Sequence, residues 1–184
     1  SRPELASQPL GLLGISRGGA AALAAALRCR EVRAIACEGV YSTESLLLHY
    51  TLRWASLYLP ARLMRMLPLW HVRMTLSLAR RVSGWRRHCR FTLIERRLPG
   101  LRKLPVLMIA GGRDTYVAPQ ITQSLCERIG SAHGPLCVFD RAKHNQSRQI
   151  DAERYDALLV GLFEKLSQND PGEVRPHSTM LSVA

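Results

Sequence analysis

The stretch GLLGISRGGAAAL, residues 11–23, places one serine between glycines where an apolar run gives way to an alanine-rich run. A strand that turns directly into a helix strains the central residue of the turn, and side chains two positions away would collide with the crossing chain. Glycine at both flanks, Gly14 and Gly18, removes that collision. The pattern G-x-S-x-G is the nucleophile elbow, which predicts that Ser16 stands clear of a sheet at the start of a helix. A glycine-rich turn that binds nothing is the alternative.

Short apolar runs alternate along the rest of the chain with longer runs of helical period. This alternation predicts an α/β fold with a doubly wound, mostly parallel sheet, because parallel strands need crossover connections. The last helical run repeats apolar residues at about the helical period. The predicted strands are 9–13, 32–37, 105–110 and 135–139, and the predicted helices are 18–29, 118–130 and 151–167.

One connection is too long for a simple crossover. About 65 residues separate the second and third predicted strands, whereas a crossover needs only about a dozen. Leucine, tyrosine and tryptophan residues recur there at helical spacing, with breaks at Pro60 and Pro68 and a third helix over about 70–82. We therefore expect a helical cap inserted into a single domain. The predicted ranges are 1–167 for the domain, 42–103 for the cap and 168–184 for a polar, disordered tail.

The formal net charge of +12 belongs to one segment of the chain. Residues 53–103 contain twelve arginines and one lysine against the single acid Glu95. Three interpretations remain open: a solvated amphipathic face, attraction of an anionic substrate or membrane surface, and nucleic-acid binding, which lacks a recognisable motif. The arginines that we assign to an anionic membrane surface are Arg80, Arg81, Arg86 and Arg87.

Composition narrows the class of protein further. A hydrophobic content of 47% excludes a disordered chain, and the absence of a long uncharged apolar run predicts no transmembrane helix. The five cysteines show no C-x-x-C spacing and lie mostly in apolar surroundings, which predicts buried free thiols in a reducing, cytoplasmic compartment. Scattered histidines give no zinc-ligand spacing, so we expect no metal. The first strand follows so soon after the first residue that we expect the C-terminal portion of a longer protein.

The elbow predicts two partners for Ser16. A serine hydroxyl needs a base to remove its proton, and the base needs an acid to hold its tautomer. In a parallel α/β sheet with this elbow the order along the chain is nucleophile, acid, base, each after the C-terminal end of a strand. Asp114 follows the third predicted strand in VLMIAGGRDTYVAP, and His144 follows the fourth in FDRAKHNQS. Order and position favour these roles over a helix-capping aspartate and a solvated loop histidine.

These three motifs carry a family resemblance. GISRGG, GGRDTYVAP and AKHN resemble the elbow, acid loop and histidine loop of the α/β-hydrolase fold superfamily, in its serine aminopeptidase-like and acyl-ester hydrolase branch. The resemblance implies a Ser16–His144–Asp114 triad and an oxyanion site that uses the backbone N–H of Arg17. Members of this family place several strands before the elbow, and a loop after one of them supplies a second oxyanion donor. This sequence departs from the family there.

The function that we expect is hydrolysis of an ester, thioester or amide bond through an acyl-enzyme intermediate. A small-molecule acyl substrate would lie under the cap, with Trp54, Tyr58 and Met64 as pocket lining, and no metal or organic cofactor is needed. The alternative is a non-catalytic, hydrolase-like module whose basic cap binds anionic lipid or another acidic partner. The uniformly apolar first strand also predicts cover on both of its faces. The resemblance implies that the other three strands lie on one side of it, which leaves one backbone edge unpaired.

Overall fold

The computed structural model describes residues 9–89, 91, 93–130 and 136–168, and the predicted tail falls almost entirely outside this range. Four strands form one parallel sheet in the order β1-β2-β3-β4. The strands are β1 (Leu10–Ile15), β2 (Val32–Glu38), β3 (Val106–Gly111) and β4 (Cys137–Phe139). The prediction of an α/β fold with a parallel sheet is therefore confirmed.

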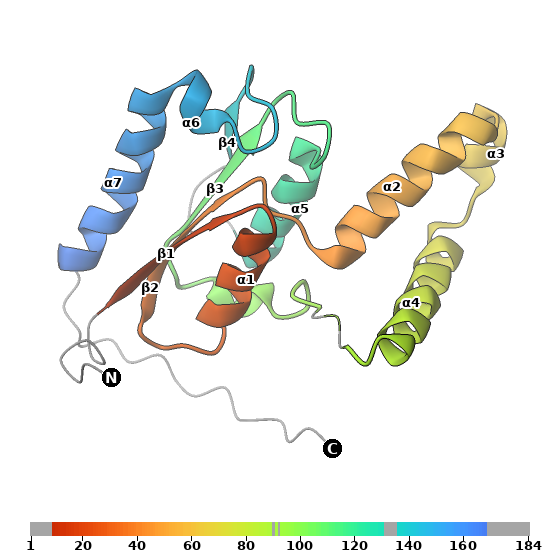
Figure 1. Cartoon of the computed structure of the whole chain (residues 1–184), viewed down its shortest axis with the longest axis horizontal. Coiled ribbons are helices and arrows are strands. Elements are labelled where there is room, and N and C mark those ends of the chain that lie inside the picture. Colours follow the sequence, from red (N-terminus) through yellow and green to blue (C-terminus); the bar gives the residue numbers. More distant parts are fainter. Residues whose placement is uncertain (1–8, 90, 92, 131–135, 169–184) are drawn as a thin grey trace.

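Helices cover both faces of the sheet (Figure 1). One face packs against α1 and α5, where Leu23 and Leu125 are fully buried in the larger apolar cluster. The other face packs against α7, where Phe139 and Tyr155 belong to a smaller cluster. The bounds are α1 (Arg17–Ala26), α5 (Pro119–Ile129), α6 (Ser147–Ile150) and α7 (Ala152–Gln168).

Strand β1 lies at the edge of this sheet, with β2 as its neighbour. Its apolar sequence predicted cover on both faces, but the large side chains of Leu10, Leu13 and Ile15 are 43–47% exposed. The strand therefore combines the composition of an interior strand with the position of an edge strand. Such an edge offers unpaired backbone groups to another strand.

The long connection between β2 and β3 forms the cap. It contains α2 (Thr43–Tyr58), α3 (Ala61–Met66) and α4 (Leu69–Arg86), and Pro60 and Pro68 stand immediately before α3 and α4. The predicted breaks at these prolines are confirmed, because proline is compatible with the start of a helix but not with its interior. The helices project from the sheet as an arm in which α4 packs against α2 (Figure 1).

The end of the predicted cap belongs to the core instead. The short 3-10 helix at Leu98–Leu101 returns to the sheet, and both of its terminal leucines are fully buried in the larger apolar cluster. No helix of the described residues combines the length and the apolar character needed to span a bilayer.

The backbone is crowded at the turn between β1 and α1. A Cβ atom added to Gly14 would lie 2.6 Å from both Gly18 O and Gly19 Cα, and one added to Gly19 would lie 2.8 Å from Val40 Cγ2. A Cβ atom added to Gly18 would meet no heavy atom within 4 Å. The expectation that both glycines flanking Ser16 avoid a collision is therefore wrong for Gly18. The second crowded glycine is Gly19.

This difference within one motif gives a paired test. We expect Gly14→Ala to lower the free energy of unfolding by about 1–3 kcal/mol or more, because its methyl group would overlap backbone atoms that cannot move aside. Gly18→Ala should be neutral or stabilising by up to about 1 kcal/mol, because alanine favours the helix that begins there. Thermal or denaturant unfolding followed by circular dichroism measures both. Equal destabilisation by the two substitutions would contradict the structure of the turn.

The cysteines only partly follow the expectation of buried thiols. Of the five, Cys37 alone is buried, whereas Cys89 is exposed. Burial raises the pKa of the Cys37 thiol to about 12, which leaves almost no reactive thiolate at neutral pH.

We expect an alkylating reagent to modify Cys89 in the folded protein and Cys37 only after unfolding. Mass spectrometry of peptides from a timed reaction tests this order, and early modification of Cys37 would contradict it.

Candidate active site

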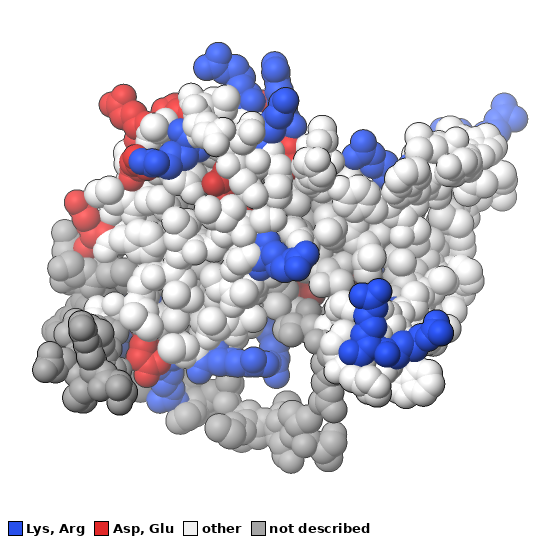
Figure 2. Space-filling model, viewed as in Figure 1, with Lys and Arg blue, Asp and Glu red and all other residues white. Residues whose placement is uncertain are grey.

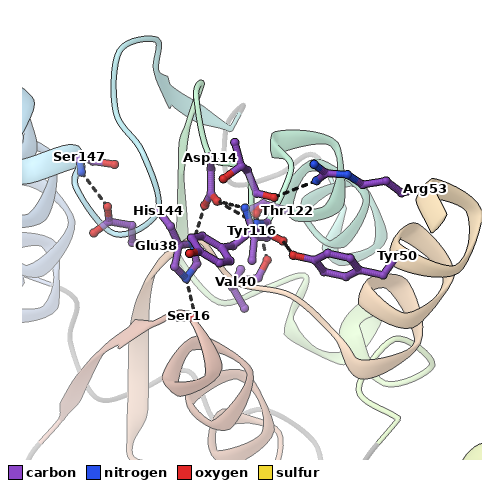
Figure 3. A network of polar contacts seen from close by, with 12 residues as sticks. Ser16, Glu38, Val40, Tyr50, Arg53, Asp114, Tyr116, Thr122, His144 and Ser147 are labelled. Carbon is purple, nitrogen blue, oxygen red and sulfur yellow. Dashed lines mark hydrogen bonds and ion pairs between the residues drawn. The ribbon is translucent and has the colours of Figure 1, made fainter. Parts of the chain in front are cut away.

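Ser16 lies between the end of β1 and the start of α1, in a backbone conformation that non-glycine residues rarely adopt. Its φ is 53° and its ψ is −118°, and such a residue costs on the order of 1–3 kcal/mol unless its surroundings hold it. The Ser16 N–H donates to the carbonyl oxygen of Glu38 on the neighbouring strand at 2.7 Å. The Ser16 side chain is directed at His144, with 2.9 Å between Oγ and Nε2 (Figure 3).

Asp114 lies on the other side of the histidine ring. Its Oδ2 atom is 2.5 Å from His144 Nδ1, and its Oδ1 atom accepts from the N–H groups of Tyr116 and Val117, each at 2.8 Å. The carboxyl group is buried, with a residue exposure of 6%. Three hydrogen bonds therefore hold a buried acid in the orientation in which it meets the histidine.

The three residues come from different strand ends. Ser16 follows β1, Asp114 follows β3 and His144 follows β4, and the carboxyl ends of parallel strands meet at one edge of the sheet. An ionised Asp114 can only accept, so Nδ1 of His144 donates to it and Nε2 is left to accept the Ser16 proton. The structure brings together the three residues that the sequence motifs selected.

Comparisons with known proteins bear on the fold of the chain. No protein-family model and no curated protein sequence matches the chain. An alpha/beta hydrolase enzyme from a metagenome of Mar Chica lagoon sediments, Morocco, is 22% identical with a TM-score of 0.52, and covers 88% of this chain. An esterase from Pyrococcus furiosus is 15% identical with a TM-score of 0.56 over 86% of this chain. Alpha/beta hydrolase domain-containing protein 10 from mouse is 20% identical with a TM-score of 0.54 over 89%.

The chain has the α/β-hydrolase fold. It spans 64%, 54% and 65% of the lengths of these three structures, respectively. At such identities the likeness concerns the fold, and the chemistry of the site has to be argued from its own residues.

Two residues that the sequence analysis did not single out lie next to the histidine ring of this α/β-hydrolase fold. Gly39 has a φ of 56°, and a Cβ atom there would lie 3.2 Å from His144 Cε1 and 3.0 Å from Asn145 Oδ1. The ring of Tyr116 is tilted against the imidazole ring, with 5.8 Å between their centroids. The ring of His144 thus lies close to the backbone of a glycine and to an aromatic side chain.

Glu38 is the main polar residue that the sequence analysis missed. It is 3% exposed at the end of β2. Its Oε1 atom accepts from the N–H of Ser147 at 2.9 Å, and its Oε2 atom accepts from the hydroxyl of Tyr155 at 3.1 Å. Burial raises the pKa of the Tyr155 hydroxyl, and the Glu38 carboxylate adds to the rise. Because Ser147 follows His144 by three residues, Glu38 anchors the histidine loop of the hydrolase fold.

The cap contacts the acid loop through residues other than the predicted pocket lining. Tyr50 Oη on α2 donates to the carbonyl oxygen of Tyr116 at 3.0 Å, and Arg53 Nη1 donates to that of Thr115 at 3.2 Å (Figure 3). The predicted lining residues Trp54 and Tyr58 are 58% and 79% exposed.

The third predicted lining residue, Met64, is partly buried on α3. A substrate-binding role for Trp54, Tyr58 and Met64 stays a prediction.

Arg17 is the first residue of α1. The N–H groups of a first helical turn have no acceptor within the helix, and the helix dipole favours negative charge there. The backbone of Arg17 is therefore suitably placed to serve as an oxyanion donor next to Ser16. Among the described residues, no three histidine, cysteine or carboxylate side chains are grouped so that they could hold a metal ion.

The role of Glu38 can be tested by stability. Glu38→Ala leaves two buried donors, the Ser147 N–H and the Tyr155 hydroxyl, without their acceptor, and we expect a loss of about 1–3 kcal/mol for each. Glu127→Ala is a matched control, because that glutamate is exposed on α5 and accepts a hydrogen bond from Gln123 on the same helix. It should change the free energy of unfolding by no more than about 0.5 kcal/mol. Denaturant unfolding compares the two variants, and similar values would contradict the anchoring role.

Proposed function

We propose that this chain provides the catalytic centre of a serine hydrolase that cleaves an ester, thioester or amide bond through an acyl-enzyme intermediate. The observation that supports the proposal is the continuous hydrogen-bonded path from Ser16 Oγ through both ring nitrogens of His144 to Asp114. A surface serine has no need of such a path. A nucleophilic serine needs it, because only the hydroxyl whose proton is removed attacks a carbonyl carbon at neutral pH.

The geometry suggests the following steps. Ser16 Oγ forms a bond to the carbonyl carbon of the substrate while its proton passes to His144 Nε2. The carbonyl oxygen becomes an oxyanion near the Arg17 N–H, and the imidazolium is stabilised by Asp114. The tetrahedral intermediate then collapses as the leaving group departs with the proton from His144. Water, activated by the same histidine, attacks the acyl-serine, releases the carboxylic acid and restores the Ser16 hydroxyl.

The competing function is a hydrolase-like module that binds an anionic partner without turning over a substrate. A module of this kind has no requirement for an activated hydroxyl, and its Ser16 would react no faster than an ordinary serine. Reaction with an electrophile that is selective for activated serines therefore separates the two functions. A fluorophosphonate forms a bond to the serine oxygen and releases fluoride, so it reports nucleophilicity independently of any natural substrate.

We expect a fluorophosphonate probe to label the wild-type protein at Ser16 and to leave Ser16→Ala unlabelled. Ser124→Ala serves as the matched control and should label like wild type, because the Ser124 hydroxyl bonds to its own helix at the carbonyl oxygen of Ile121. Peptide mass spectrometry identifies the modified residue. Absence of labelling in the folded wild-type protein would reject the proposal and favour the binding module.

Hydrolysis of short p-nitrophenyl esters provides the second measurement. Ser16→Ala and His144→Ala should each reduce kcat by on the order of a thousandfold or more and to a similar extent, because the residues of a triad act as a unit. Turnover of an ester, a thioester and an amide that share one acyl group then shows which leaving group the protein prefers. Ester turnover that is unchanged in Ser16→Ala would show that another residue carries the reaction.

A further inference from the structure

Helix α4 of the cap exposes a continuous apolar stripe. Trp70, Met74, Leu78, Val82 and Trp85 follow one another at intervals of four, four, four and three residues, which places them along one side of the helix. All five are 46–77% exposed. Monomeric soluble proteins rarely leave large apolar side chains in such a row without a partner surface.

The opposite side of α4 supplies its attachment to the cap. Val72 on that side is 8% exposed, and α4 packs against α2. The side chain of Arg80 is only 11% exposed, with its guanidinium 3.9 Å from the Glu44 carboxylate on α2. Arg80, which the sequence analysis grouped with the membrane-binding arginines, is therefore directed towards the cap. Because this side of α4 packs against α2, the apolar stripe on the other side of α4 faces away from α2.

Positive charge borders the stripe. Exposed arginines on or directly after α4 are Arg73, Arg81, Arg86 and Arg87, and the helix contains no aspartate or glutamate. Figure 2 shows basic side chains gathered over the C-terminal end of α4. A second copy of the same chain would bring like charges together, whereas an anionic surface is attracted.

A groove of about 680 Å³ opens at the same end of the helix. Its lining combines the cationic side chains Arg80 and Arg81 and the imidazole of His88 with the aromatic rings of Trp85 and Phe91. Arginine forms bidentate hydrogen bonds with phosphate oxygens. The aromatic rings can contact the apolar part of an amphipathic molecule, so the groove fits a phosphate-bearing headgroup better than a purely apolar ligand.

We infer that α4 is an interfacial helix that docks this protein on an anionic phospholipid bilayer. Trp70, Met74, Leu78 and Trp85 lie at the boundary between headgroups and acyl chains, and Arg81, Arg86 and Arg87 lie over the lipid phosphates. Tryptophan at both ends of a stripe that is bordered by arginine suits this boundary, because its ring is apolar and its N–H is polar. The inference uses no residue of the proposed triad and is independent of the proposed function.

The tryptophans of the chain make a direct test available. The protein contains three, Trp54, Trp70 and Trp85, and all lie on exposed positions of the cap. Intrinsic tryptophan fluorescence therefore reports on the cap alone. We expect vesicles of phosphatidylcholine with phosphatidylglycerol to shift the emission of the full chain to shorter wavelength, and phosphatidylcholine vesicles to cause little shift. Raising the salt concentration should reverse the shift, because surface attraction is screened within about 8 Å at physiological ionic strength.

Variants locate the docking surface. Arg81→Glu with Arg86→Glu should weaken vesicle binding by at least about tenfold. Arg28→Glu with Arg30→Glu is the charge-matched control, because both arginines are exposed between α1 and β2, outside the cap. This control should weaken vesicle binding much less. In Trp54→Phe the shift should persist, because Trp70 and Trp85 remain on α4. Circular dichroism confirms that each variant is folded.

Several results would overturn the inference. An absence of any shift with anionic vesicles, or an equal shift with both kinds of vesicle, would exclude electrostatic docking on a bilayer. Equal loss of binding in the two charge-reversed variants would show that only net charge matters. Loss of the shift in Trp54→Phe would move the contact from α4 to α2. A shift without vesicles that grows with protein concentration would assign the stripe to contacts between copies of the chain.

Discussion

Glu38 is bonded to both sides of the contact between Ser16 and His144. Its carbonyl oxygen accepts the Ser16 N–H at 2.7 Å, and its carboxylate accepts the Ser147 N–H, three residues beyond the histidine, at 2.9 Å. Burial of a carboxylate costs free energy, and hydrogen bonds from such partners offset that cost. The hydroxyl of Tyr155 donates the second bond to this carboxylate at 3.1 Å. One residue of the central strand thereby positions the strained elbow and the histidine loop relative to each other.

The acid reaches the histidine through a turn that is bonded on two sides. The N–H groups of Tyr116 and Val117 point inward to Asp114, while the carbonyl oxygens of Thr115 and Tyr116 accept from Arg53 and Tyr50 on the cap. Backbone groups near the surface of a loop usually bond to water instead. Here side chains of the cap donate these hydrogen bonds. The first helix of the cap thus supports the acid loop. Substitution of Tyr50 or Arg53 on this helix would remove a bond to the loop that holds Asp114, whether or not the cap also lines a substrate pocket.

Local sequence carries enough information to predict the strands, the helices and the three residues, Ser16, Asp114 and His144, whose side chains the fold brings together. Apolar runs define the strands, and Pro60 and Pro68 divide the cap. The G-x-S-x-G pattern identifies Ser16 because all of its residues lie within five consecutive positions. The contacts of Glu38 could not be predicted in this way, since its partners Ser147 and Tyr155 lie 109 and 117 residues away. The same limit applies to Arg80, which pairs with Glu44 on another helix. The sequence showed the charge of that arginine but not the direction of its side chain.

The distribution of charge separates two regions that differ in their sensitivity to the surrounding solution. The polar groups around Ser16, His144 and Asp114 bond to one another at short distances within the fold, and dissolved ions screen such contacts weakly. The excess positive charge instead belongs to residues 53–103, where Arg81, Arg86 and Arg87 are exposed and ions screen them strongly. Changes in ionic strength should therefore affect the exposed arginines of the cap without rearranging the hydrogen bonds among Ser16, His144 and Asp114. The proposed membrane docking and the proposed hydrolysis are compatible in one chain, because different elements supply the exposed charge and the hydrogen-bonded serine.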